Sequence, residues 1–138
     1  MENIIKDLAQ RTNNEAEKKF GTTCGWAEAL KVHIVVGRKI LPIAMYQNRD
    51  HGVDPAVVRL DFYEITKGKV CLVKKIEIGE HYKRPAGRSY FVRPTIYACG
   101  PNIGVKVVWN KLTGFYPYYG HQYEYKTLYD CDMVFTIT

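Results

Sequence analysis

The chain has 138 residues, of which 46% are hydrophobic and 25% are charged, and its formal net charge is +6. This length and apolar content predict one hydrophobic core in a single domain over residues 1–138, and they disfavour disorder. No apolar run approaches the ~18 residues that a membrane helix needs, and the polar N-terminus lacks a signal-peptide core, so we expect a cytoplasmic protein without membrane contact.

Residues 1–20 are predicted to form an amphipathic helix. Apolar residues recur at helical spacing between Ile4 and Leu8, most other positions are polar, and Gly21 is placed to end the helix. The Asn13–Asn14 pair consists of poor helix formers, so we expect the middle of the helix to be weak or broken. The narrow apolar face predicts that the helix packs as one layer on another element.

A first pair of strands is predicted after this helix. In residues 30–36, apolar and polar side chains alternate in a way that places Ile34 and Val36 on the buried face. The chain then turns and returns through residues 40–47. Because Pro42 cannot donate a ladder hydrogen bond, it predicts a sheet edge or a bulge.

A second hairpin is predicted from residues 56–66 and 70–78. Apolar side chains alternate with polar ones such as Arg59 and Asp61, which is the period of a half-buried strand. The residues expected to point inward are Val58, Leu60 and Phe62 in the first strand and Val70, Leu72, Ile76 and Ile78 in the second.

Three more strands are predicted over residues 89–97, 105–112 and 133–138. No helical pattern of ten or more residues separates the strands, which disfavours parallel connections. We therefore predict an α+β fold, with an N-terminal helix packed on one twisted antiparallel sheet or half-barrel of about six or seven strands. In this scheme residues 30–138 form the β-rich body, and residues 22–29 fit either a short second helix or the approach to the first strand.

The net charge is concentrated in residues 67–93. This segment holds eight basic and two acidic residues, whereas the rest of the chain holds twelve of each. Such a positive field attracts phosphates and acidic surfaces and accelerates association in a salt-dependent way.

The connection at residues 79–88 is the predicted ligand-binding element. If strands 70–78 and 89–97 are neighbours, this connection gathers basic side chains at one tip, where Gly87 lets the backbone approach a phosphate. Guanidinium groups match phosphate geometry, and tyrosines stack on bases. Basic residues at a hairpin end also protect a sheet edge or aid solubility, so both interpretations stay open. The predicted ligand-binding residues are Lys74, Lys75, Lys83, Arg84, Arg88, Arg93, Tyr82, Tyr90 and Tyr118.

Residues 115–129 form a tyrosine-rich run with seven aromatic side chains in fifteen positions. Such clusters suit base stacking or protein recognition. Alternate tyrosines such as Tyr123 and Tyr125 would instead cover one face of a strand.

Two cysteine segments resemble those of known enzymes. The stretch TTCGWAEAL around Cys24 resembles the nucleophile segment of papain-type and transglutaminase-type enzymes, in which a cysteine opens a helix whose dipole lowers the thiol pKa. The stretch ACGPNIG around Cys99 is similar to the Cys-Gly-Pro of some cysteine peptidases. Either resemblance implies a partner histidine such as His51 and an orienting group such as Asp50.

The sequence predicts no metal site and no cofactor. Its four cysteines contain no C-x-x-C pair, its four histidines occur singly, and neither common glycine-rich phosphate loop is present. In a reducing compartment the thiols are expected to be free.

These features favour a non-enzymatic protein that binds a phosphate-bearing ligand, either single-stranded nucleic acid or a free nucleotide. One alternative is a protein-interaction or inhibitor module that docks on an acidic partner or on its own copies as a homo-oligomer, a role found among small viral and phage accessory proteins. The other alternative is a Cys/His hydrolase or transferase.

Overall fold

A computed structural model describes the backbone of residues 2–48, 55–81, 89–116 and 122–137, and the side chains of residues 2–48, 56–79, 93–108 and 133–137. The elements in chain order are α1 (Glu2–Phe20), β1 (Gly25–Ala29), β2 (His33–Val35), β3 (Arg38–Asn48), β4 (Pro55–Thr66), β5 (Lys69–Glu77), α2 (Ile78–His81), β6 (Ser89–Cys99), β7 (Asn102–Tyr116) and β8 (Gln122–Thr136).

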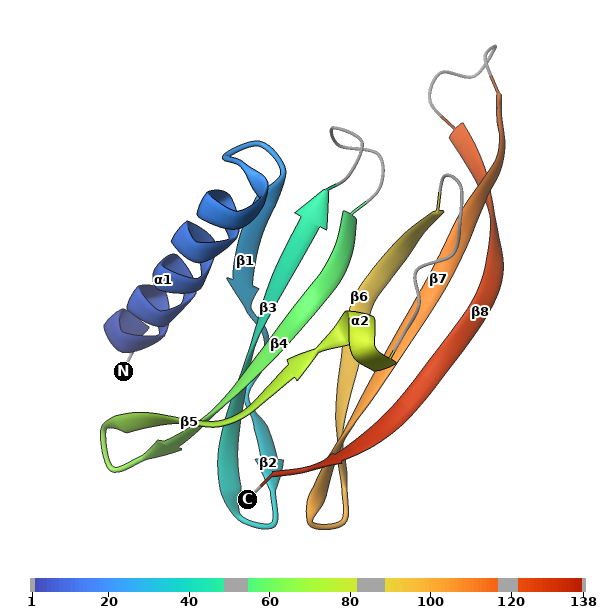
Figure 1. Ribbon diagram of the computed structural model, residues 1–138. Coiled ribbons are helices and arrows are strands. Elements are labelled where there is room, and N and C mark those ends of the chain that lie inside the picture. The colour runs from blue at the N-terminus through green and yellow to red at the C-terminus, as the bar shows by residue number, and fades with distance from the viewer. Residues whose placement is uncertain (1, 49–54, 82–88, 117–121, 138) are drawn as a thin grey trace.

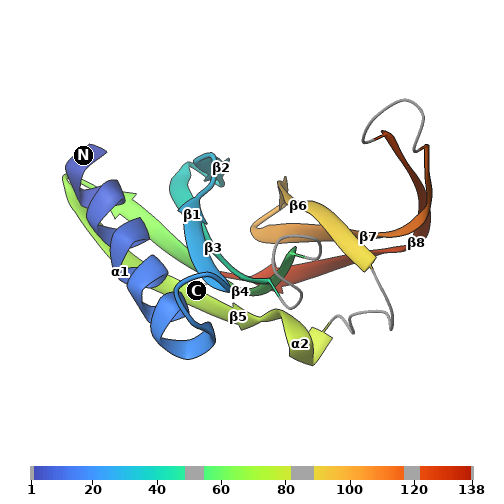
Figure 2. The ribbon, with the colours of Figure 1, turned by 90° about the horizontal axis from the view of Figure 1, so that it is seen from above.

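The predicted α+β fold is confirmed: one N-terminal helix packs on antiparallel β-structure. The strands form two sheets instead of one, with the order β1-β3-β4-β5, in which β2 also pairs with β3, and the order β6-β7-β8. Figures 1 and 2 show α1 on one side of the first sheet and the second sheet on the other side. Within the described residues neither sheet closes on itself.

The main hydrophobic core lies between the two sheets. Side chains of the first sheet, such as Leu60 and Phe62, are fully buried and belong to one cluster with Ile103 and Val105 of the second sheet. A second, smaller cluster lies under α1 and joins Leu8 to Leu41 and Ile43. The first sheet is therefore covered on both faces, by the second sheet and by the helix.

The helix α1 runs without a break, so the predicted interruption at the asparagines is wrong. The Asn13 side chain accepts a hydrogen bond from the backbone N–H of Ala27 (3.0 Å) and donates one to Glu17 (3.1 Å). Asn14 accepts one from Gln10 (2.8 Å). Because both asparagine side chains are hydrogen-bonded to these partners, they do not compete with the backbone hydrogen bonds of the helix. Asn13 also satisfies a free backbone group on the outer edge of β1.

The start of the first sheet differs from the prediction in two ways. Residues 25–29 form strand β1 and not a second helix. In β2 the faces are reversed, since Val35 is fully buried while Ile34 and Val36 are largely exposed. The reversal follows from the turn: Val36 and Gly37 both have positive φ (50° and 74°), so Val36 lies within the turn and Val35 is the last strand residue before it.

Pro42 lies inside β3, opposite the short interval between the end of β1 and the start of β2, which both pair with β3. The N–H of Leu30 donates to its carbonyl oxygen (2.8 Å), after β1 ends and before β2 begins. Because the N–H and C=O of a strand residue point to the same side, the missing N–H faces this interval and costs no bond to β4.

Two β-bulges shift the inward residues of the second hairpin. The register of the β3–β4 pair shifts by one residue between Met45 and Tyr46. The register of the β4–β5 pair shifts in the same way between Phe62 and Tyr63. Bulges add one residue to one strand and therefore exchange the two faces locally. As a result Val57 is buried in place of Val58, and Val73 packs on the main core while Leu72 is 48% exposed. The predicted inward positions Leu60, Phe62, Ile76 and Ile78 are confirmed.

The contact between α1 and β1 depends on Gly25. A Cβ atom at this position would overlap the backbone carbonyl of Ala16, which is fully buried in the helix. Only glycine allows the helix to lie this close to the strand.

The variant Gly25→Ala is expected to lower the free energy of unfolding by about 1–3 kcal/mol, because the added methyl group pushes α1 away from β1. Urea unfolding followed by circular dichroism measures the change. Gly79→Ala is the matched control, since among the described residues, its chain neighbours apart, no atom lies within 4 Å of an added Cβ there. An unfolding midpoint for Gly25→Ala equal to that of the control would contradict the close contact.

Candidate functional site

Most of the predicted ligand-binding residues lie outside the described part of the chain. These residues are Tyr82, Lys83, Arg84, Arg88 and Tyr118. His51, the predicted partner histidine of a reactive cysteine, also lies outside the described residues. Tyr90 lies in β6, but its side chain is not described. Their roles stay predictions.

The strands on either side of the predicted binding connection are not neighbours. β5 belongs to the first sheet and β6 to the second, so residues 79–88 do not close a hairpin between paired strands. The short helix α2 follows β5 directly and leads the chain towards the second sheet (Figure 1). The expected arrangement, in which this connection is a hairpin tip, is therefore corrected.

Lys74 and Lys75 lie on opposite faces of β5. Lys74 is opposite Phe62, which points into the main core, and Lys75 is opposite Asp61, on the face that carries α1. Because successive side chains of a strand alternate between faces, the two ammonium groups cannot contact one phosphate from the same side.

The guanidinium of Arg93 is bonded to a carboxylate. Its Nε lies 2.6 Å from Oε1 of Glu28, so the contact joins β6 of the second sheet to β1 of the first. Tyr46 donates a hydrogen bond to the same oxygen (2.8 Å) and stacks on Trp26 at 4.1 Å between ring centroids. Burial and the nearby Glu28 raise the pKa of the Tyr46 phenol, so it stays a donor at neutral pH. This group links the two sheets.

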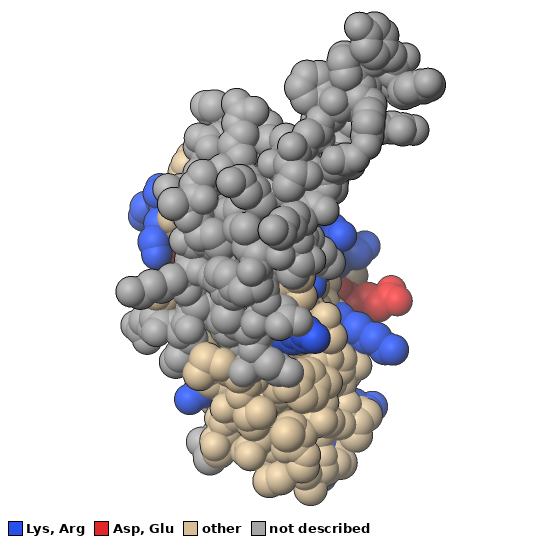
Figure 3. All heavy atoms as spheres, turned by 90° about the vertical axis from the view of Figure 1, so that its right-hand side faces the viewer, with Lys and Arg blue, Asp and Glu red and all other residues tan. Residues whose placement is uncertain are grey.

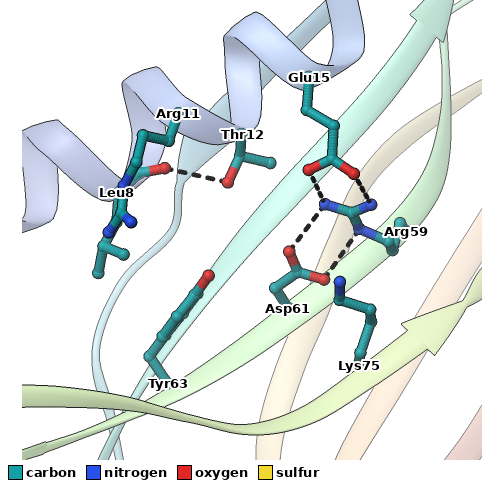
Figure 4. A pocket seen from close by; sticks show the side chains of 8 residues that line it. All are labelled: Leu8, Arg11, Thr12, Glu15, Arg59, Asp61, Tyr63 and Lys75. Atoms are coloured by element: carbon teal, nitrogen blue, oxygen red, sulfur yellow. Dashed lines mark hydrogen bonds and ion pairs between the residues drawn. The ribbon is translucent and has the colours of Figure 1, made fainter. Parts of the chain in front are cut away.

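A polar cavity of about 180 Å³ lies between α1 and the strands β4 and β5 (Figure 4). Helix residues form one wall, and residues of the two strands form the other. The complete lining is Leu8, Arg11, Thr12, Glu15, Arg59, Asp61, Tyr63 and Lys75.

Arg59 forms a buried, charged part of the cavity wall. Only 6% of its side chain is exposed, and its two Nη atoms donate to the carboxylate of Glu15 at 2.6 and 2.8 Å. On the other side, Nη2 donates to Oδ2 of Asp61 (3.0 Å), and Nε lies 3.0 Å from Oδ1. A buried charge must be paired, and here two carboxylates share one guanidinium.

The two carboxylates have different environments. Hydrogen bonding to Arg59 holds the pKa of Glu15 below its ordinary value, and 52% of its side chain is exposed. Burial raises the pKa of Asp61, of which only 3% is exposed, although Arg59 partly offsets that effect. Asp61 is thus fixed inside the protein, whereas Glu15 reaches the pair from the solvent side.

Two cations of the cavity, Arg11 and Lys75, form no ion pair with a described carboxylate, although the charge of Lys75 acts on Glu15 and Asp61. Arg11 lies on the side of Leu8, and Lys75 lies beside Asp61 (Figure 4). The Tyr63 hydroxyl points into the space between them. The alternation in β4 predicted that Arg59 and Asp61 share a face, but no local pattern indicated that Glu15 and Arg11 would lie opposite them.

The cysteines do not assemble a nucleophilic site in the described region. Cys24 follows the end of α1 and precedes a strand, so it does not open a helix as in the enzymes it resembles. Its thiol lies 3.6 Å from the Thr23 hydroxyl, and Cys99 is exposed. Of the described residues, no group of three His, Cys, Asp or Glu side chains could hold a metal ion, and no described helix is long and apolar enough to cross a membrane.

Comparison of the chain with protein-family models, with curated proteins and with solved structures gives no match. The function must therefore be inferred from the chemistry of the surface and of the cavity.

The variant Glu15→Gln is expected to lose part of the pH dependence of stability. Because Arg59 lowers the pKa of Glu15 from 4.5, its stabilising effect is fully present above that pH and disappears as the pH falls through the lowered pKa. Urea unfolding should show a larger difference between wild type and variant near pH ~6 than near pH ~3. Glu17→Gln controls for removing a carboxylate from the same helix. A difference that does not vary with pH would contradict the ion pair.

Proposed function

We propose that this protein is a non-enzymatic binder of a phosphate-bearing ligand, either single-stranded nucleic acid or a free nucleotide. The ligand is bound by the basic residues of the β4–β5 hairpin and of the segment that follows β5. Tyr82, Tyr90 and Tyr118 are the proposed stacking groups.

The observation that carries this proposal is the difference between paired and unpaired cations. Arg38, Arg59 and Arg93 each bind a carboxylate of the protein itself, at distances of 2.6 to 2.9 Å. By contrast, the lysines of the hairpin have no described ion pair, and they are Lys67, Lys69, Lys74 and Lys75. The charge of Lys75 also acts on Glu15 and Asp61 without forming an ion pair, whereas the positive charge of the other three lysines is available to an external anion.

The charge on the surface of the second sheet also supports the β4–β5 hairpin as the ligand-binding region. On the side formed by the second sheet, the described surface is mostly uncharged in its lower part, and Lys and Arg side chains lie towards its margins (Figure 3). The β4–β5 hairpin, by comparison, carries Lys67, Lys69, Lys74 and Lys75 within nine residues. An exposed lysine ammonium binds phosphate as a point charge, with little sequence preference.

Salt dependence provides the test. Binding of a fluorescent oligothymidylate should weaken steeply as salt is raised, because phosphate contacts release counterions. Arg84→Ala or Arg88→Ala should each reduce the affinity by about 1–3 kcal/mol, and Lys74→Gln should reduce it less. Lys18→Gln, on the exposed helix surface, is the control for a loss of net charge.

An affinity that does not change with salt, together with an unchanged Arg84→Ala/Arg88→Ala double variant, would contradict the proposal. Equal losses for Lys18→Gln and the segment variants would show only a response to net charge.

A further inference from the structure

We infer that the cavity between α1, β4 and β5 is the site that takes the phosphate group, and that Glu15 occupies this site until the ligand displaces it. The inference rests on the proposed function and specifies where the phosphate binds. It assigns to Glu15 the part of an internal substitute for the ligand.

The geometry of the Arg59–Glu15 contact is the first support. Glu15 receives two nearly parallel hydrogen bonds from the guanidinium, at 2.6 and 2.8 Å. This bidentate arrangement is the one in which arginine also binds two oxygens of a phosphate. A phosphate that replaced the Glu15 carboxylate would therefore find its donors already in position.

The unequal burial of the two carboxylates is the second support. The Glu15 side chain is 52% exposed and can rotate into solvent without moving α1, whereas Asp61 is 3% exposed. Asp61 keeps its contacts to Nε and Nη2 of Arg59, both at 3.0 Å, and so holds the guanidinium in orientation after Glu15 leaves. The site is preorganised on the buried side and open on the exposed side.

The charge balance is the third support. With Glu15 in place, the lining residues carry three positive and two negative charges, and with Glu15 outside they carry a net charge of +2. A phosphate monoester carries about −1.5 to −2 at neutral pH. Its charge would then be matched by Arg59 on the buried side and by Arg11 and Lys75 at the rim, with the Tyr63 hydroxyl as a further donor (Figure 4).

The size of the cavity agrees with this ligand. Its volume of about 180 Å³ is more than ten times the ~15 Å³ that a single water requires, so a phosphate group and several waters fit. A base or a second nucleotide would extend beyond it, over the exposed Lys75 and the edge of β5.

The test is isothermal titration with inorganic phosphate and with 5′-AMP at neutral pH. Glu15→Gln should raise the affinity about tenfold, because the neutral amide still accepts one bond from Arg59 but competes weakly with phosphate. Glu17→Gln removes the same charge from the same helix outside the cavity and should change the affinity less than about twofold. Arg11→Gln and Lys75→Gln should each lower it about tenfold. Neither side chain forms a described ion pair, and the folded fraction of the Lys75→Gln variant is checked by circular dichroism because the Lys75 charge also acts on Glu15 and Asp61.

A purely structural ion network gives a different result. In that case Glu15→Gln and Glu17→Gln would alter phosphate affinity equally, and Arg11→Gln and Lys75→Gln would have no effect; either outcome overturns the inference.

The failure of the inference and the failure of the proposed function are distinguishable. Oligothymidylate binding that is lost in Arg84→Ala/Arg88→Ala but unchanged in Glu15→Gln and Lys75→Gln would overturn the cavity site and leave the proposed function intact. Phosphate binding with the predicted order of variants, but without oligothymidylate or 5′-AMP binding, would support the cavity site and overturn the proposed function.

Discussion

The burial of Arg59 is the constraint on which the arrangement of α1 depends. A guanidinium on the outer face of a central strand has to be covered and paired, since an unpaired buried charge costs several kcal/mol. Asp61, two residues along the same strand, supplies one partner from the same face. Glu15 supplies the other from the helix, so the charge pairing fixes which turn of α1 lies above β4. Packing at Gly25 then holds the other side of the helix against β1.

This arrangement explains why a cavity exists at this position. The helix contacts β1 and β3 closely and reaches β4 through the long Glu15 and Arg59 side chains. The space beneath these side chains is therefore lined by polar groups and not filled by apolar ones. On the opposite face of the sheet, apolar residues of both sheets interlock, and Arg93 and Glu28 tie the sheets together. The described polar cavity thus lies on the helix side of the first sheet, whereas the described side chains between the two sheets are mostly apolar.

Local pattern was sufficient to predict the helix, most strands and the polar face of β4 that carries Arg59 and Asp61. The same pattern predicted the wrong inward residues where a bulge adds one residue to a strand and so reverses which side chains face the core. The bulges that turn Val57 and Val73 towards the main core depend on pairing with a neighbouring strand, which no local alternation reveals. The division into two sheets was also not predictable, because local alternation does not show which strands pair with one another. Likewise, Glu15 and Arg11 become site residues only when α1 is placed over β4, through contacts between segments 44 residues apart.

The central claim is that one guanidinium serves both the fold and the ligand. The most direct measurement is an NMR titration of the Arg59 side-chain resonances with inorganic phosphate in ¹⁵N-labelled protein. We predict that the Nη signals of Arg59 shift on saturation, while the backbone amides of α1 change little because Gly25 and Asp61 keep the helix and the guanidinium in place. Arg59 signals that stay unchanged throughout the titration would contradict the account.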